Sequence, residues 1–305
     1  MKTVTWEIEY LFDRPKKSDE INFREAPLEV PPGVEELVRR SWLEQLRRKQ
    51  RGLRDIDHPT SIRRVEGALP SLYEGPKRIM WPGPVVSLKA VRVNGKYVDL
   101  FVGKTTYPFI RALGEQPVTE LYEGHQMKKP LPALGIGTYA ITVDDRMVFT
   151  LRGNHTAMYP GRIYGQGGNP EHPYTDLVEH QLNEMEDEIL VRRSETDLKT
   201  LRLMGIVRDE ETFKGKPCLM GWVKVKVTAE ELKKRMRKRP LRDRPSDAID
   251  IVCIPATPSE LSEYISTTPS QEWCPTGQGG VVLYGHYHFG KKWAEDTIRK
   301  IERYN

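Results

Sequence analysis

The sequence predicts an α+β protein in which helices cover the faces of a curved sheet. Two observations carry this prediction. Strand-type segments occur in pairs around turn residues, and amphipathic helical segments lie between and after those pairs. Of the 305 residues, 38% are hydrophobic and 30% are charged, which suffices for a buried core and excludes a mainly disordered chain.

The first part of the chain, residues 1–80, is expected to be an N-terminal accessory segment ahead of a main domain at residues 81–305. Residues 4–12 alternate loosely and favour a strand. Residues 35–51 predict a basic amphipathic helix that includes Trp42. Such a helix can bind a membrane or a nucleic acid, but docking of its apolar stripe on its own domain is the commoner outcome. A dimer contact, a lid over a pocket and a structural flank are all open roles for this segment.

The middle of the chain is predicted to consist mainly of strands joined by turns. Asn94-Gly95 separates two strand-type runs and is a strong signal for a two-residue hairpin, and Asp144-Asp145 separates the next two runs. Residues 106–113 begin a short helix or a loop. The expected strands cover residues 85–93, 97–103, 134–143, 147–151, 162–164, 201–207, 218–227, 249–254 and 280–284.

Three helices are expected in the C-terminal part. Thr228 is placed to cap the first, Ser259 to cap a second that runs through Ile265, and residues 293–303 form the last. The most basic run, residues 233–244, overlaps the first of these helices. It could meet the phosphates of RNA or of a nucleotide, although a solvated helix end and loop is the commoner interpretation.

The segment GGNPEHPYTDLVEHQLNEMEDEIL, residues 167–190, gives the strongest functional signal. A Gly-Gly turn leads through a polar loop into a helix that carries Glu184, Asp187 and Glu188 at spacing i, i+3, i+4, so that they share one face. Three such carboxylates repel one another unless a cation lies among them. Oxygen-only ligands suit Mg²⁺, Mn²⁺ or Ca²⁺ rather than Zn²⁺. The alternative interpretation is a solvated acidic face, the usual fate of such a triplet.

The order of hairpin, strand, Gly-Gly turn, acidic helix and strand resembles the Nudix hydrolases. The resemblance implies an α/β/α sandwich with a curved mixed sheet, and hydrolysis of a diphosphate linked to a further group. It places Glu184, Asp187 and Glu188 on the metal-binding carboxylates of the family, and Gly168 near the glycine whose carbonyl is a metal ligand. The cofactor that this implies is Mg²⁺, with Mn²⁺ as a substitute.

This chain departs from the family pattern at three points. Asn183 replaces the arginine that orients the helix carboxylates, Leu190 replaces the glycine after them, and Asp176 is the nearest candidate for the first acid. Over residues 35–285 the order of elements resembles the animal Nudix-type UDP-glucose and UDP-galactose diphosphatases. That resemblance implies a UDP-sugar as substrate and UMP with a sugar 1-phosphate as products.

The resemblance also implies roles for individual residues. Glu188 is expected to be the central metal ligand, and Glu184 a ligand or the base for the attacking water. Asp247 is expected as a further acid from a downstream loop, with Asp250 as the alternative. Arg152 ends the second strand of the hairpin and points, by family analogy, toward the diphosphate, where a guanidinium suits phosphate oxygens.

Two tyrosines complete the expected substrate site. Tyr107 and Tyr159 could stack a base or cover the sugar, although each is more often simply a half-buried strand or loop residue. His180 lies four residues before Glu184 and could contact a phosphate, with a plain polar helix position as the alternative. The spacing of the histidines and the lack of paired thiolates argue against a zinc set.

The net charge and the cysteine content limit the binding partners and the cellular compartment that the sequence predicts. The net charge of +5 is modest, so an anionic substrate is allowed and a nucleic acid is allowed but not favoured. The three cysteines are far apart and odd in number, and the chain shows no secretion signal or long apolar run, so a cytoplasmic protein without a membrane partner is expected.

The leading hypothesis is a Mg²⁺-dependent pyrophosphohydrolase that acts on a nucleotide-sugar or another nucleoside diphosphate derivative. One alternative is a catalytically silent Nudix-like domain that binds nucleotides or RNA. The other is a Nudix enzyme that acts on RNA 5′ ends and grips the phosphate chain with its basic run.

Overall fold

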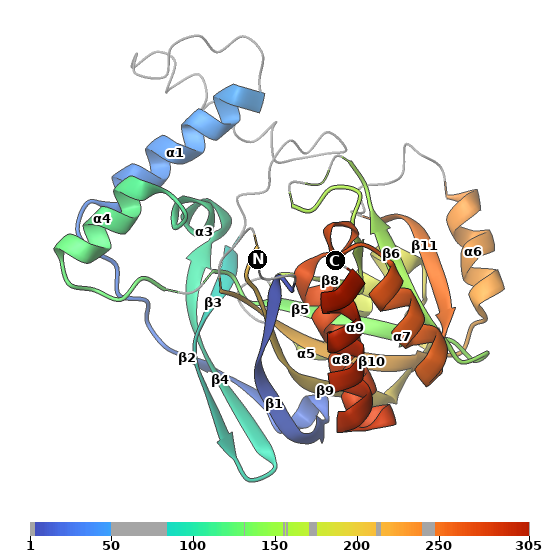
Figure 1. Ribbon diagram of the computed structural model, residues 1–305. Helices are drawn as coiled ribbons and strands as arrows, with labels where there is room; N and C mark the ends of the chain where they lie inside the picture. Colours follow the sequence, from blue (N-terminus) through green and yellow to red (C-terminus); the bar gives the residue numbers. More distant parts are fainter. Residues whose placement is uncertain are drawn as a thin grey trace.

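The computed structural model describes residues 4–49, 84–130, 132–154, 156, 158–170, 176–211, 215–239 and 248–304. The described residues form a large sheet and a small sheet with helices around them (Figure 1). The strands are β1 (Trp6–Lys16), β2 (Ile21–Glu25), β3 (Pro84–Asn94), β4 (Tyr97–Thr106), β5 (Gly135–Ile141), β6 (Arg146–Arg152), β7 (Ile163–Tyr164), β8 (Gln166–Gly168), β9 (Thr196–Asp209), β10 (Lys216–Val225) and β11 (Ala248–Pro255).

The helices connect and cover these strands. The α-helices are α1 (Val34–Lys49), α3 (Tyr107–Ala112), α4 (Gln116–Gly124), α5 (Leu177–Ile189), α6 (Ala229–Lys238), α7 (Pro258–Thr267), α8 (Pro275–Phe289) and α9 (Lys291–Tyr304). Short 3₁₀ turns are η1 (Ser18–Glu20), η2 (Arg193–Glu195) and η4 (Ser270–Glu272). In the described part of the chain, no helix is both long and apolar enough to cross a membrane.

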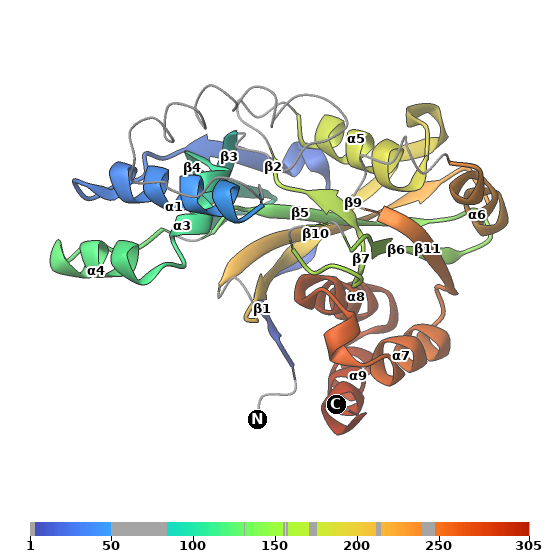
Figure 2. The same cartoon turned by 90° about the horizontal axis from the view of Figure 1, so that it is seen from above.

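The main sheet is mixed and lies between two layers of helices. Its order is β1-β9-β10-β5-β6-β11, with β10 and β5 parallel and the other neighbours antiparallel. Helices α5 and α6 cover one face, and α7, α8 and α9 cover the other (Figure 2). The predicted α+β class and its α/β/α sandwich with a curved mixed sheet are therefore confirmed.

Each face of the main sheet has its own apolar core. On the α8 face, Tyr139, Phe149 and Trp273 are fully buried and pack edge-to-face with one another or through Tyr264. On the α5 face, Met185 is fully buried among residues of α6 and the sheet. Each such side chain contributes about 1.5–3 kcal/mol through removal of its surface from water.

The hairpin predicted around Asn94-Gly95 is confirmed as β3 and β4. Its loop is Gly95-Lys96, because Asn94 already pairs with Tyr97. Gly95 has φ +58°, the left-handed conformation that a two-residue hairpin loop needs and that glycine adopts without strain. With β2, these strands form the small sheet β2-β4-β3, which packs on the main sheet beside the start of α5.

The N-terminal residues are not separate from the main sheet. Strand β1 pairs with β9 at its edge, with Trp6 opposite Asp209. Helix α1 buries Trp42 and packs with α3 and α4, as expected for docking on its own domain. The predicted boundary at residue 80 lies outside the described residues, so the division into residues 1–80 and 81–305 stays a prediction.

Two element predictions were wrong. Residues 280–284 lie inside helix α8 and do not form a strand, because the glycines there let the helix touch the sheet. A side chain at Gly279 would come within 2.7 Å of Val207, and one at Gly280 within 2.7 Å of the Tyr139 hydroxyl. The cap of α7 is Thr257, which accepts from the Glu260 N–H, and not the expected Ser259.

Candidate functional site

The glycine pair that was predicted to form a turn instead ends the short strand β8 in the middle of the main sheet; we keep the name Gly-Gly turn for Gly167 and Gly168. Strands β5 and β6 form the second predicted hairpin but pair only at Ile141 and Met147, and then diverge. The short strands β8 and β7 fill the gap, with β8 on β5 and β7 on β6. Gly167 lies opposite Gly137, and a side chain on it would overlap the carbonyl oxygen of Ile136. The close pairing of β8 with β5 therefore requires glycine at position 167.

Two acids of helix α5 contact this turn. Glu188 is 4% exposed and accepts a hydrogen bond from the Gly167 N–H at 2.9 Å. Glu184 lies one turn earlier against Gly168, where an added side-chain carbon would come within 2.9 Å of the Glu184 carboxyl carbon. The apolar residues of the opposite face, including Leu182 and Met185, are buried in the core as predicted.

Asp187 does not join these two acids. Its side chain is exposed, and its backbone carbonyl accepts from Nη1 of Arg239 at 2.7 Å. Each helical residue rotates by about 100°, so Asp187 faces away from the direction of Glu188. Among the described residues, no three His, Cys, Asp or Glu side chains lie close enough together to hold a metal ion. The predicted set of three carboxylates is therefore not brought together, and Asp247 lies outside the described residues.

The donors beside the turn are nevertheless hard oxygens. Glu184 and Glu188 supply two carboxylates, and Oδ1 of Asn169 is buried with no hydrogen-bond partner in the described structure. Mg²⁺ and Mn²⁺ favour oxygen ligands, and Mg²⁺ commonly binds through one or two carboxylates together with water and substrate phosphates. The residues present thus fit a divalent cation held by Glu184 and Glu188.

His180 lies on the same helix beside these acids. Its Nε2 is 3.7 Å from Oε1 of Glu184, and its side chain is 13% exposed. Burial lowers the pKa of His180 to about 4, against a smaller opposing effect of a hydrogen bond with the Gly168 backbone. His180 is therefore neutral near pH 7, which favours the polar helix position over the phosphate contact.

A cavity of about 210 Å³ opens on the other side of the two glycines. Gly168 and the three residues predicted to bind substrate, Arg152, Tyr107 and Tyr159, all line it. The same cavity also contains residues that the sequence did not single out. These are Asn169, Asp209, Lys216, Cys274 and Thr276 among others.

The predicted substrate residues are held by neighbours. Nε of Arg152 donates to the Met158 carbonyl at 3.1 Å. The Tyr159 hydroxyl donates to the carboxylate of Asp209, and the guanidinium of Arg162 lies 4.8 Å from the centre of the Tyr159 ring. One face of that ring is thus covered by the guanidinium of Arg162.

Lys216 and Asp209 form the end of the cavity between β9 and β10. They are cross-strand partners that flank a charged loop, a local pattern without a recognisable motif. Asp209 is 1% exposed and also accepts from the Glu211 N–H at 2.9 Å. Burial is the main cause that lowers the pKa of Lys216.

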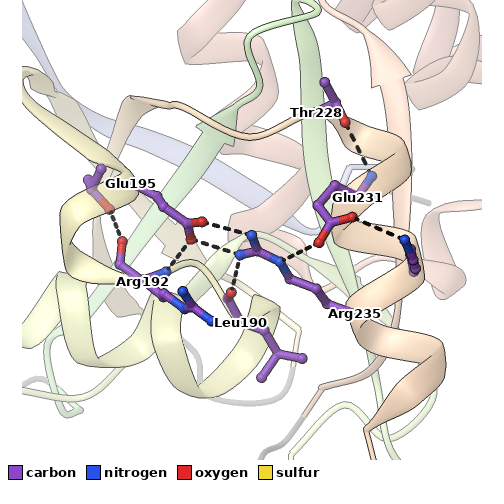
Figure 3. A network of polar contacts seen from close by, with 8 residues as sticks. Leu190, Arg192, Glu195, Thr228, Glu231 and Arg235 are labelled. Carbon is purple, nitrogen blue, oxygen red and sulfur yellow. Dashed lines mark hydrogen bonds and ion pairs between the residues drawn. The ribbon is translucent and has the colours of Figure 1, made fainter.

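Helix α5 is anchored at its C-terminal end by Arg235 (Figure 3). Leu190, which stands where the Nudix pattern has glycine, has φ +58° and is therefore left-handed. Nη1 of Arg235 donates to the Leu190 carbonyl at 3.0 Å, and both terminal nitrogens pair with Glu195 at 2.7 Å. Nε of Arg235 binds Glu231 at 3.1 Å. Arg235, which belongs to the basic run at residues 233–244, therefore has a structural role and is not available to bind a phosphate.

Comparison with known proteins gives one curated relative and several solved structures. No family model matches the chain. The chain is 26% identical over 167 residues to the human protein named uridine diphosphate glucose pyrophosphatase NUDT22, a match over 50% of this chain and 54% of the relative. The chain therefore spans about half the length of this relative. The similarity confirms the resemblance to Nudix proteins that the sequence predicts.

Solved structures with related folds are more distant. The Nudix domain of Shewanella oneidensis NrtR, complexed with ADP ribose, is 12% identical with a TM-score of 0.36, over 56% of this chain and 96% of that domain. A bifunctional NMN adenylyltransferase/ADP ribose pyrophosphatase from Francisella tularensis, complexed with AMP and a manganese ion, is 13% identical with a TM-score of 0.35, over 60% and 50% of the two chains.

Proposed function

We propose that this Nudix-like chain is a hydrolase that cleaves the diphosphate of a nucleoside diphosphate linked to a further group. We take a UDP-sugar as the substrate, with UMP and a sugar 1-phosphate as products. The name of the human relative supports this choice of substrate. The two acids on the Gly-Gly turn support the choice of reaction.

One observation carries the proposal: the same two glycines contact the acids and line a cavity with cationic side chains. Glu188 binds Gly167 and Glu184 abuts Gly168, while Arg152 and Lys216 lie in the cavity. A diphosphate is an anion that needs positive charge on its oxygens and a polarised water at one phosphorus. The cavity supplies the positive charge, and Glu184 and Glu188, which contact the same glycines but do not line the cavity, supply the second requirement.

Each residue then has a separate task. Glu188, held by the Gly167 N–H, and Glu184 are the residues that would hold Mg²⁺, or Mn²⁺ in its place. When bound, the ion would supply charge that offsets the diphosphate and assists ionisation of water. Glu184 would also accept the proton of the attacking water. The water oxygen bonds to one phosphorus, and the bridging oxygen leaves with the other phosphate.

The remaining groups position the substrate. The guanidinium of Arg152 suits two phosphate oxygens because its donors lie in one plane. Tyr107 lines the cavity with its ring edge-on to Trp42, at 6.3 Å between ring centres. Tyr107 and Tyr159, which both line the cavity, would contact the base or the sugar.

The test is a substrate panel with the full chain. UDP-glucose, UDP-galactose, ADP-ribose and a 5′-triphosphorylated RNA are each incubated with Mg²⁺ or Mn²⁺, and mononucleotide and sugar phosphate are quantified by chromatography. We expect UMP and sugar 1-phosphate in equal amounts from a UDP-sugar. Release of inorganic phosphate alone, or cleavage of the RNA only, contradicts the proposal.

A nucleotide-binding domain without activity is the second candidate, favoured by the outward position of Asp187. It predicts that UDP-glucose binds in calorimetry while no product forms with either metal. An RNA-directed role is less supported, because Arg235 of the basic run is committed to Glu195 and Glu231.

A further inference from the structure

We propose that Lys216 binds a phosphate oxygen of the substrate in the cavity beside the Gly-Gly turn. The inference deepens the proposed function and rests on it for the identity of the ligand. It adds a residue that no motif in the sequence indicates. Three features carry it: the path of the side chain, its lack of a partner, and the charge around it.

The side chain of Lys216 runs across the sheet toward the turn. Lys216 begins β10, and the next parallel strand is β5, with Cys218 opposite Gly135. A side-chain carbon added to Gly135 would lie 3.6 Å from Cε of Lys216, so the lysine chain passes over this glycine. On β5 the following residue, Ile136, pairs with Gly168 of β8. Lys216 thus extends along the row that leads to the two glycines.

The Lys216 ammonium has no hydrogen bond or ion pair with any residue that the structure describes. Its cross-strand neighbour Asp209 directs its carboxylate to the Tyr159 hydroxyl and the Glu211 N–H instead. Lys216 is partly buried, and burial is the largest cause that lowers the pKa of this lysine, while the charge of Asp209 opposes the shift. An anionic ligand in the cavity would supply the missing partner.

Other groups in the cavity favour an anion at the same place. Arg152 adds a second cation, and the 15-residue helix α8 begins here, with Cys274 and Thr276 in the wall. The N-terminal end of a helix carries partial positive charge and attracts phosphate. Lys216 supplies a full charge that makes no hydrogen bond or ion pair with a described residue, so the proposal depends on Lys216 and not on the helix end.

Binding of UDP to the full chain tests the inference without catalysis. Calorimetry in the presence of a chelator compares the wild type with Lys216→Met, which keeps the length of the side chain and removes its charge. We expect UDP to bind roughly 10- to 100-fold more weakly, the usual effect of losing a hydrogen bond to a charged group. Lys216→Arg, which keeps the charge, is expected to recover part of the affinity.

Lys224→Met is the matched control, because Lys224 lies on the same strand but is exposed outside the cavity. It should bind UDP as the wild type does. A folded Lys216→Met chain with unchanged affinity overturns the inference. So does equal loss of affinity in Lys224→Met.

A second measurement uses the wild type alone, in case the variant does not fold. The rate of amine acylation at Lys216 is followed by mass spectrometry with and without UDP, with Lys224 as the internal reference. UDP should protect Lys216 and leave Lys224 unaffected, and lack of protection overturns the inference.

The two proposals fail in different ways. If UDP binding depends on Lys216 but no diphosphate is cleaved, the proposed reaction is wrong and the binding role stands. If UDP-glucose is cleaved and Lys216→Met has the wild-type KM, the reaction stands and the binding role is wrong.

Discussion

Replacing Arg235 with methionine should destabilise the protein, and the loss should be largest when Glu195 is ionised. The guanidinium joins α6 to the C-terminal end of α5 through the Leu190 carbonyl and Glu195, and it also binds Glu231 of its own helix (Figure 3). Methionine keeps most of the apolar length of the side chain. The substitution therefore removes charge and hydrogen bonds while leaving the packing largely intact.

The size of the effect follows from the burial of the pair. The side chains of Arg235 and Glu195 are 22% and 20% exposed, between the surface pairs that contribute up to about 1 kcal/mol and the buried pairs whose disruption costs about 3–5 kcal/mol. We expect a loss of about 2 kcal/mol in the free energy of unfolding. Glu195, Glu231 and the Leu190 carbonyl all lose their hydrogen bonds to Arg235 at once, so the expected loss of stability exceeds that of a single surface ion pair.

The pKa of Glu195 determines how the stability difference between the wild type and Arg235→Met changes with pH. The hydrogen bond from Arg235 is the largest cause that lowers the pKa of Glu195 from 4.5 to about 2. A depressed carboxyl pKa contributes stability that is fully present above 4.5 and is lost as the pH falls toward 2. The difference between wild type and variant should accordingly be largest near neutral pH and shrink in acid.

Urea unfolding followed by circular dichroism measures both quantities, near neutral pH and at about pH 3. Arg237→Met on the same helix is the control, because Arg237 is exposed and, among the described residues, its side chain binds only the Lys233 carbonyl. A loss of stability in Arg235→Met below about 0.5 kcal/mol, or one that does not change with pH, would refute the reasoning.

Two further substitutions probe the positioning of helix α5. Leu190→Gly relieves a left-handed leucine and should raise the free energy of unfolding, measured in urea, by about 0.5–1 kcal/mol, whereas Leu198→Gly at an exposed position of β9 should lower it. A destabilised Leu190→Gly chain would mean that the packing of Leu190 outweighs its strain. In Gly168→Ala the added methyl group would push against the Glu184 carboxyl group, so the rate of UDP-glucose hydrolysis should fall roughly 10- to 100-fold with little change in stability. A wild-type rate would show that Glu184 need not lie against Gly168.

The sequence predicts the acidic helix well because its signals are local. The apolar stripe of Leu182, Met185 and Ile189 sets the buried face of α5, and the glycines mark the turn before it. The position of Asp187 was less predictable. Spacing of i, i+3, i+4 allows three carboxylates to share a broad face, but only Glu184 and Glu188 reach the turn.

The rest of the site depends on contacts between distant segments. Lys216 and Asp209 meet the turn only through the order β9-β10-β5-β8, which no local pattern encodes. The strand predicted at residues 280–284 failed for a related reason. The short run of glycines, valines and other apolar residues at 279–284 is compatible with either a buried strand or a buried helix. Only its close packing against Tyr139 and Val207 favours the helix.

The most direct test of the central claim compares Glu188→Gln with Glu186→Gln, a matched change on an exposed face of the same helix. Calorimetry measures Mn²⁺ binding, and product analysis measures cleavage of UDP-glucose. We predict that Glu188→Gln loses metal binding and reduces hydrolysis by roughly 100-fold or more, while Glu186→Gln keeps both. Hydrolysis and metal binding at wild-type levels in Glu188→Gln would contradict the assignment of this turn and its acids as the active site.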